Sequence, residues 1–183
     1  MRVIGGRFGG RTLTAPRGQA TRPTPERVRE AVFSILGDVE GTTVLDLFAG
    51  SGALAIEALS RGARLATLVD SSATAIRVIR RNLAPLGVSA EIRHQRALPF
   101  LRGARDYGRQ YDLVFLDPPY SQATALGRHL SPALVPVLAP GARVVVESDR
   151  RGPLKLELRA TTDERRYGDT LIEIYRLPTD NDT

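Results

Sequence analysis

Short apolar runs alternate with helical patterns along most of the chain. The runs at 44–48 and 112–116 are almost unbroken, as in strands that are buried in a parallel sheet. Further strands are predicted at 65–69, 91–94 and 143–147, and helices at 53–61, 73–86, 98–107 and 124–138, the last with a bend near Pro132. Two more runs, 154–167 and 171–177, have no helix between them and predict a C-terminal hairpin. This order predicts an α/β fold, Rossmann-like and doubly wound, whose mostly parallel seven-stranded sheet is covered on both faces.

The first 36 residues have a different pattern. Glycine pairs at 5–6 and 9–10 separate short β-prone pieces, which predict a β-hairpin. Thr24 and Pro25 then predict a helix that has Thr24 as its N-cap and Pro25 at its first position. We therefore expect a basic hairpin and docking helix at 1–36, a main domain at 37–178 and a disordered tail at 179–183.

The composition excludes several functional classes. A chain of 183 residues has the length of one domain, and no apolar run approaches the roughly 18 residues that cross a membrane. No apolar secretory segment follows the first charged residues, so the expected compartment is the cytoplasm. The absence of cysteine excludes disulfides, thiolate metal sites and a cysteine nucleophile. His94 and His129 are too few for a histidine metal site, and we expect a monomer without metal.

Positive charge is concentrated near the N-terminus. The chain has a formal net charge of +6 from 26 basic and 20 acidic residues, and 25 of the basic residues are arginine. Residues 1–36 hold seven arginines and two glutamates, which leaves this fifth of the chain with a net charge of +5. A general preference for arginine explains the residue type but not its clustering, so we expect a polyanionic partner such as nucleic acid. Arg77, Arg80 and Arg81 are interpreted instead as the solvated face of a helix.

A glycine-rich turn joins the first predicted strand to its helix. In the segment Asp46-Leu-Phe-Ala-Gly50-Ser-Gly52, the two glycines allow the backbone to approach a ligand closely. Asp70 stands at the end of the next strand, where a carboxylate can accept hydrogen bonds from both hydroxyls of a ribose. These features indicate a cofactor that contains adenosine, and by themselves they fit a dinucleotide equally well.

A second motif narrows the choice of ligand. Asp117-Pro118-Pro119-Tyr120 follows the fourth predicted strand, at the same edge of the sheet as the glycine-rich turn. Two prolines fix the backbone and remove two N–H donors, which leaves carbonyl groups free to accept. A carboxylate and a rigid carbonyl can hold both hydrogens of an exocyclic amino group, and Tyr120 offers a ring on which a base can stack. The motif therefore indicates an amino-group binding site rather than an ordinary turn.

The combination of motifs resembles a known family. Asp46-x-Phe48-x-Gly50-x-Gly52 with Asp117-Pro-Pro-Tyr120 is similar to the motifs of class I S-adenosylmethionine-dependent amino methyltransferases. The chain resembles the RsmD-type bacterial methyltransferases more closely, and over nearly its whole length. The segments that carry this resemblance are Arg2-Val-Ile-Gly-Gly6, Arg22-Pro-Thr24-x-x-Arg27-Val-Arg-Glu30 and the segment from Phe48 to Arg61.

The resemblance implies a function and a partner. S-adenosylmethionine would supply a methyl group to the exocyclic N2 of a guanine in small-subunit (16S) ribosomal RNA, without a covalent enzyme intermediate. The partner would be ribosomal RNA or the small ribosomal subunit. The residues that we assign are Asp117, Pro118, Pro119 and Tyr120 for catalysis, Asp46, Phe48, Gly50, Gly52, Asp70 and Ala97 for the cofactor, and Arg2, Arg7, Arg11, Arg22 and Arg27 for RNA.

One position departs from the family's pattern. Such enzymes often place an acidic or amide residue against the adenine amino group, whereas this chain has Arg96 there. A guanidinium has no acceptor for the hydrogens of that amino group. Either backbone groups near Ala97 contact the adenine, or the cofactor is held less specifically.

Two other functions are compatible with part of the sequence. An amino methyltransferase that acts on DNA adenine N6 or on a protein glutamine would share the catalytic motif, but a glutamine enzyme does not need the basic segment at 1–36. A non-catalytic RNA-binding protein would share that segment, but it does not need Asp46, Asp70 and Asp117 beside the glycine-rich turn.

Overall fold

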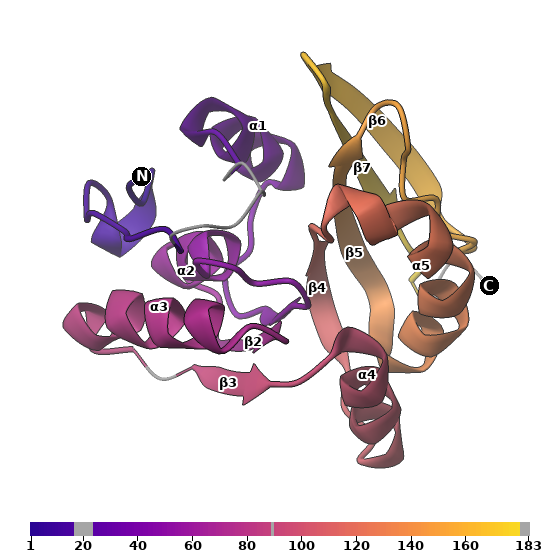
Figure 1. Cartoon of the computed structure of the whole chain (residues 1–183), viewed down its shortest axis with the longest axis horizontal. Helices are drawn as coiled ribbons and strands as arrows, with labels where there is room; N and C mark the ends of the chain where they lie inside the picture. The colour runs from indigo at the N-terminus through magenta and orange to yellow at the C-terminus, as the bar shows by residue number, and fades with distance from the viewer. Residues whose placement is uncertain (17–23, 89, 180–183) are drawn as a thin grey trace.

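A seven-stranded sheet forms the centre of the molecule (Figure 1). The computed structural model describes residues 1–16, 24–88 and 90–179. The strand order is β3-β2-β1-β4-β5-β7-β6. The strands are β1 (Thr43–Asp46), β2 (Leu65–Asp70), β3 (Glu91–His94), β4 (Tyr111–Leu116), β5 (Leu138–Asp149), β6 (Thr161–Tyr167) and β7 (Thr170–Arg176). The first five strands pair in parallel, while β7 is antiparallel to β5 and to β6, so the predicted fold class is confirmed.

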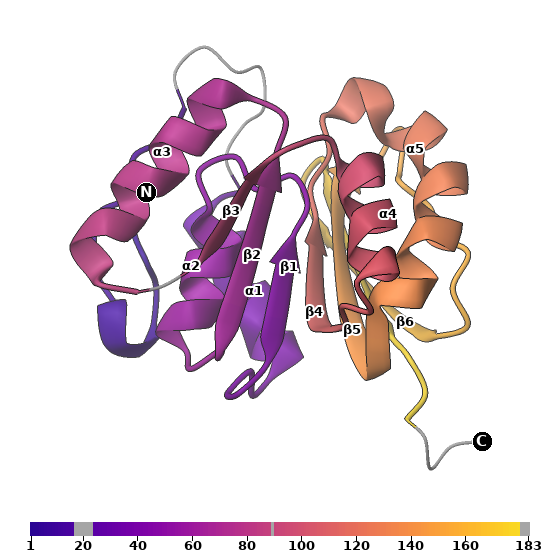
Figure 2. The same cartoon turned by 90° about the horizontal axis from the view of Figure 1, so that it is seen from below.

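Helices cover both faces of this sheet (Figure 2). One face packs against α1 (Glu26–Leu36), α2 (Ala53–Ser60) and α3 (Ala73–Leu83), and the other against α4 (Ala97–Asp106) and α5 (Tyr120–Leu134). Successive side chains of a strand project to opposite faces, so Val44 of β1 joins the first apolar cluster and Leu45 the second. Short 3-10 helices lie at Gly6–Phe8, Ala84–Leu86 and Val135–Val137. Within the described ranges, no helix is both long and apolar enough to cross a membrane.

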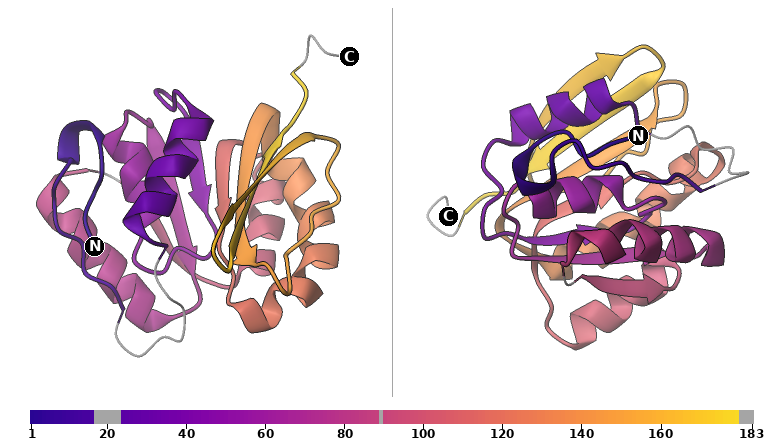
Figure 3. Two further views of the ribbon diagram at one scale, coloured as in Figure 1. Left: turned by 90° about the horizontal axis from the view of Figure 1, so that it is seen from above. Right: turned by 90° about the vertical axis from the view of Figure 1, so that its left-hand side faces the viewer.

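The N-terminal segment packs against α2 and α3 (Figure 3). Val3 and Leu13 are buried in the apolar cluster of the α1–α3 face. The carboxylate of Glu57 on α2, itself fully buried, accepts hydrogen bonds from the backbone N–H groups of Ile4 at 2.7 Å and Gly5 at 2.9 Å. The segment turns through the first 3-10 helix and forms one antiparallel bridge, between Arg2 and Thr12, where the sequence predicts a hairpin of two strands.

The structure also differs from the sequence prediction at residues 154–160 and at Thr24. Residues 154–160 lie outside the sheet, because the N–H groups of Leu156 and Glu157 donate to the side chains of Tyr175 and Ser131 instead of to a neighbouring strand. The predicted N-cap Thr24 is wrong. Pro25 caps α1 without a side-chain hydrogen bond, and the Thr24 hydroxyl donates to Glu147 on β5.

We expect Gly6→Ala to destabilise the protein more than Gly10→Ala. Both glycines have a positive φ, +73° and +83°, which costs an L-residue roughly 1–2 kcal/mol. A Cβ at position 6 would also lie 1.9 Å from the carbonyl oxygen of Ser60, whereas a Cβ at position 10 would meet no atom within 4 Å. Urea unfolding of the two variants measures the difference, and equal free energies of unfolding would contradict the contact at Gly6.

Candidate functional site

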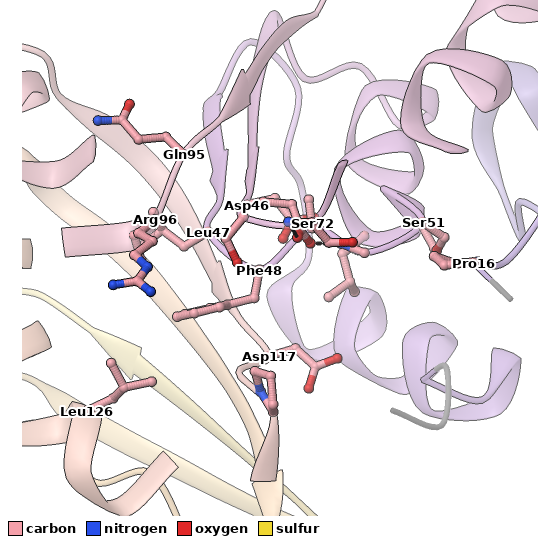
Figure 4. Close-up of a pocket in the computed structure, with 18 of the residues that line it drawn as sticks. Pro16, Asp46, Leu47, Phe48, Ser51, Ser72, Gln95, Arg96, Asp117 and Leu126 are labelled. Atoms are coloured by element: carbon pink, nitrogen blue, oxygen red, sulfur yellow. Dashed lines mark hydrogen bonds between the residues drawn. The ribbon is translucent and has the colours of Figure 1, made fainter. Parts of the chain in front are cut away.

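A cavity of about 880 Å³ opens at the carboxyl edge of the sheet, beside the ends of β1, β2 and β4 (Figure 4). The strand order reverses between β1 and β4, and ligands of open α/β sheets bind at such a reversal. The cavity wall contains these residues singled out from the sequence: Asp46, Phe48, Gly50, Asp70, Ala97, Asp117 and Pro119. It also contains residues to which the sequence assigned no role, among them Met1, Ser51, Arg102 and Leu126.

The glycine-rich turn brings backbone to the cavity wall. Gly50 and Gly52 have φ of +54° and +78°, a conformation that other residues rarely adopt. Gly50 lines the cavity, and a Cβ there would meet only the Phe48 carbonyl oxygen, at 3.9 Å. At Gly52 a Cβ would lie 2.9 Å from the Leu68 side chain. Gly50 is therefore placed to face a ligand, while Gly52 allows α2 to pack closely on β2.

Asp70 connects the turns that follow β1 and β2. One carboxylate oxygen accepts from the Gly50 N–H at 2.8 Å, and the other accepts from the Ser72 N–H at 2.7 Å. Each oxygen keeps a second lone pair, because an ionised carboxylate has about four acceptor positions. Asp70 can therefore hold the turn and still accept hydrogen bonds from ligand hydroxyls in the cavity.

Asn82 holds the same turn by side-chain hydrogen bonds, a role that the sequence did not reveal. It is a buried polar residue on the inner side of α3. Its Nδ2 donates to the carbonyl oxygens of Ser51 and Thr14, and its Oδ1 accepts from the Thr14 N–H, each at 2.9 Å. One side chain thus fixes the glycine-rich turn to the N-terminal segment. An amide among the apolar inner positions of a helix is the signal that could have identified it.

Carboxyl groups gather in the part of the cavity between β1, β4 and β5. Burial raises the pKa of Asp46 to about 7, and the nearby charge of Asp70 adds to this, while hydrogen bonds from the backbone of Ala55 and Phe48 oppose it. Burial also raises the pKa of Asp117 well above its usual value, and the charges of Glu147 and Asp46 act in the same direction. The site is therefore able to hold protons, or a cationic ligand, near neutral pH.

Helix α4 begins at the cavity wall with Ala97. Arg96 stands at its N-cap and its side chain makes no capping hydrogen bond. The N–H groups of the first turn of a helix have no partner within the helix, so the Ala97 N–H is available to a ligand. Gln95 also lines the cavity, but Figure 4 shows its side chain directed away from Asp46, Phe48 and Asp117. These positions favour the backbone at Ala97 over a side chain for contact with a flat ring.

The remaining predicted site residues do not line the cavity as the structure describes it. Pro118 is buried beside the cavity, and Tyr120 begins α5, but its side chain is not among those that the structure describes. Arg22 lies outside the described residues. Arg7, Arg11 and Arg27 are exposed on the N-terminal segment and α1. Arg2 is exposed too, but its backbone N–H and guanidinium both contact the Glu26 carboxylate, at 2.9 and 3.1 Å. In the described part of the chain, no three His, Cys, Asp or Glu residues are grouped so that they could hold a metal ion.

Comparison with known proteins identifies a matching family model, related sequences and a similar solved structure. A family model described as Conserved hypothetical protein 95 matches residues 1–176. "Putative rRNA methyltransferase YlbH" of Bacillus subtilis is 36% identical over 185 residues, which cover 96% of this chain and 98% of that protein. "Ribosomal RNA small subunit methyltransferase D" of Escherichia coli is 41% identical over 122 residues, or 66% of this chain and 60% of that protein. A solved structure titled "Putative methyltransferase yhhF from Escherichia coli" is 32% identical, covers 98% of this chain and 99% of its own, and has a TM-score of 0.84.

We expect Asp46→Asn to change how stability depends on pH. The folded protein binds a proton at Asp46 up to about pH 7, whereas the unfolded chain loses it near pH 4, so wild-type stability falls as pH rises between these values. Asparagine removes this contribution, which reaches at most about 1.4 kcal/mol per pH unit. Urea unfolding from pH 4 to 8 should show the variant gaining on the wild type as pH rises. A constant difference would show that Asp46 titrates normally.

Proposed function

The chain belongs to the family described as Conserved hypothetical protein 95 and is an S-adenosylmethionine-dependent rRNA methyltransferase, and we propose that it methylates the exocyclic N2 of a guanine in 16S rRNA. One observation carries the proposal: Asp117 and Pro119 line the same cavity as Gly50 and Asp70. An amino-group site is thus adjacent to a site suited to an adenosine cofactor.

The cavity fits S-adenosylmethionine in size and chemistry. A volume of about 880 Å³ lies within the range of roughly 300–1,000 Å³ that small-molecule sites occupy. Asp70 would accept from the ribose hydroxyls, and the Ala97 N–H would donate to the adenine ring. The backbone at Gly50 would lie against the methionine part. The carboxyl groups of Asp46 and Asp117, whose pKa values burial raises, would ionise more readily beside a sulfonium cation and would then stabilise it. When bound, the cofactor supplies an electrophilic methyl group.

Asp117 and the Pro118 carbonyl orient the substrate amine in this proposal. The amine is neutral, and its lone pair is delocalised into the guanine ring. Two acceptors that hold its two hydrogens turn the nitrogen toward the methyl group, so most of the catalytic effect comes from orientation. The bound cofactor would supply the methyl group, its sulfur would keep the electron pair of the broken carbon–sulfur bond, and one amine proton would have to leave. The carboxylate of Asp117 would accept that proton.

The basic N-terminal segment would hold the RNA backbone. Arg7 and Arg11 are exposed, and Arg27 extends this surface on α1. Met1 and Pro16 of the same segment line the cavity, so an RNA strand bound along this segment would extend from these arginines to the cavity. The target base must be unstacked to reach the cavity, which is feasible in single-stranded loops of rRNA.

The target atom can be identified directly. Small-subunit rRNA and assembled small subunits from a deletion strain are incubated with the enzyme and labelled cofactor, then digested to nucleosides. We expect N2-methylguanosine as the labelled product. Label in N6-methyladenosine, or in protein, would refute guanine N2 as the acceptor.

We expect Asp117→Ala and Asp70→Ala to separate catalysis from cofactor binding. Asp117→Ala should nearly abolish methyl transfer and leave cofactor affinity within a few-fold, because this carboxylate contacts the amine. Asp70→Ala should weaken cofactor binding by roughly 1–3 kcal/mol, since ribose hydroxyls lose their acceptor. Titration calorimetry and single-turnover rates measure the two effects. Wild-type turnover by Asp117→Ala would refute the proposed mechanism.

We expect a double Arg7→Gln, Arg11→Gln variant to bind RNA more weakly at low salt. Each phosphate contact contributes about 0.7 to the slope of log affinity against log salt for single strands, so the slope should become shallower by about 1.4. Arg165→Gln with Arg166→Gln is the control, because these exposed arginines lie on β6 at the other end of the sheet (Figure 1). Equal slopes for both variants and the wild type would assign RNA binding to another surface.

A further inference from the structure

Glu147 is a buried carboxyl group that the proposed methyl transfer does not use. It follows the apolar run Val144–Val146 on β5 and is 4% exposed. The parallel register pairs Leu116 of β4 with Val146 of β5, so Asp117 and Glu147 are the next residues along the two strands. Residues at the same level of a sheet project to the same face. The two carboxyl groups are therefore neighbours, and the charge of Glu147 acts on Asp117.

Glu147 has one hydrogen-bond donor from the N-terminal part of the chain. Thr24 Oγ1 donates to Glu147 Oε2 over 2.6 Å, and both Thr24 and Asp117 line the cavity. The other residues facing the pair are Asp46 from β1, which adds negative charge, and Ile172 from β7, which is apolar. Among the described residues, none of the ion pairs joins a basic side chain to Glu147 or to Asp117.

Two neighbouring carboxyl groups without a cation cannot both ionise readily, so such a pair retains one proton between them. Thr24 donates to Glu147 Oε2, which leaves Oε1 available for the retained proton. We propose that Glu147 is a positioning residue for methyl transfer: Oε1 shares this proton with the Asp117 carboxyl group, and the hydrogen bond between the two groups directs the other Asp117 oxygen at the substrate amine as an acceptor. The inference rests on the role proposed above for Asp117.

Substitutions at Glu147 test this role. Glutamine keeps both contacts, because its NH₂ group donates toward Asp117 and its carbonyl accepts from Thr24, whereas alanine keeps neither. We expect Glu147→Gln to retain kcat within a few-fold and Glu147→Ala to lower it about 10²-fold, the effect of a small misplacement of a reacting group. KM for RNA and the Kd for S-adenosylmethionine, measured by calorimetry, should change little in both.

The dependence of kcat on pH provides a readout that a merely structural role of Glu147 would not change. In the wild type, kcat should fall as rising pH removes the proton that Glu147 and Asp117 share. Glutamine cannot lose this donor, so kcat of Glu147→Gln should show no such fall over the same range. Identical profiles for the two proteins would overturn the proposal.

Three further variants keep the test independent of folding. Thr24→Val removes the hydroxyl with little change in shape and should lower kcat, while Thr24→Ser should restore it. Glu173→Gln is the matched control, because Glu173 is equally buried, on β7, but pairs with Lys155 at 2.8 Å. We expect its kcat and pH profile to match the wild type.

A failure of the role proposed for Glu147 can be distinguished from a failure of the proposed function. Wild-type kcat in Glu147→Ala, or Glu147→Gln as slow as alanine with normal cofactor binding, would overturn the role of Glu147 while Asp117→Ala stays inactive. An active Asp117→Ala enzyme would refute the proposed function itself.

Discussion

The reversal of strand order between β1 and β4 determines where the acidic residues of the candidate site lie. From β1 the chain crosses toward β2 on one side, and from β4 it crosses toward β5 on the other, so the turns after these strands diverge and leave a cavity. The two-residue period of a strand then decides which side chains share a face. Asp46 ends β1, Asp117 follows β4 and Glu147 lies within β5. All three are on the face covered by α1 to α3, beside the buried Val44, Phe115 and Val145. A shift of one residue in any of these strands would turn its carboxyl group to the opposite face.

Side chains, more than backbone pairing, attach the N-terminal segment to the rest of the molecule. Glu57 binds the N–H groups of Ile4 and Gly5, and Asn82 binds both backbone groups of Thr14. Asn82 also holds Ser51 of the glycine-rich turn. The segment proposed to bind RNA and the turn proposed to bind the cofactor are therefore both held by the buried side chain of Asn82. A displacement of either one would also displace the other.

The sequence predicts features that depend on neighbours along the chain and misses those that depend on distant partners. The strands and helices of the parallel sheet follow from local periodicity, and Gly50, Asp70 and Asp117 follow from short motifs that end strands. Thr24 was misassigned as an N-cap because its partner, Glu147, is 123 residues away. Leu154 and Leu156 are apolar enough for a strand, but side chains of Ser131 and Tyr175 take the nearby N–H groups and keep this segment out of the sheet. Pairing of Arg2 with Glu26 is likewise invisible in a local pattern.

Strand β6 is at the outer end of the sheet, where unpaired backbone groups would offer a template to a second copy of the chain. Its exposed side chains pair within the strand at a spacing of two residues. Arg165 lies 3.2 Å from Asp163 on one face, and Arg166 lies 2.7 Å from Glu164 on the other. The opposite end is similar, since Glu91 of β3 pairs with Arg93 and Arg109. A strand that approached either edge would have to remove water from ion pairs that are already satisfied. The arginine-rich composition thus also protects the sheet against edge-to-edge aggregation.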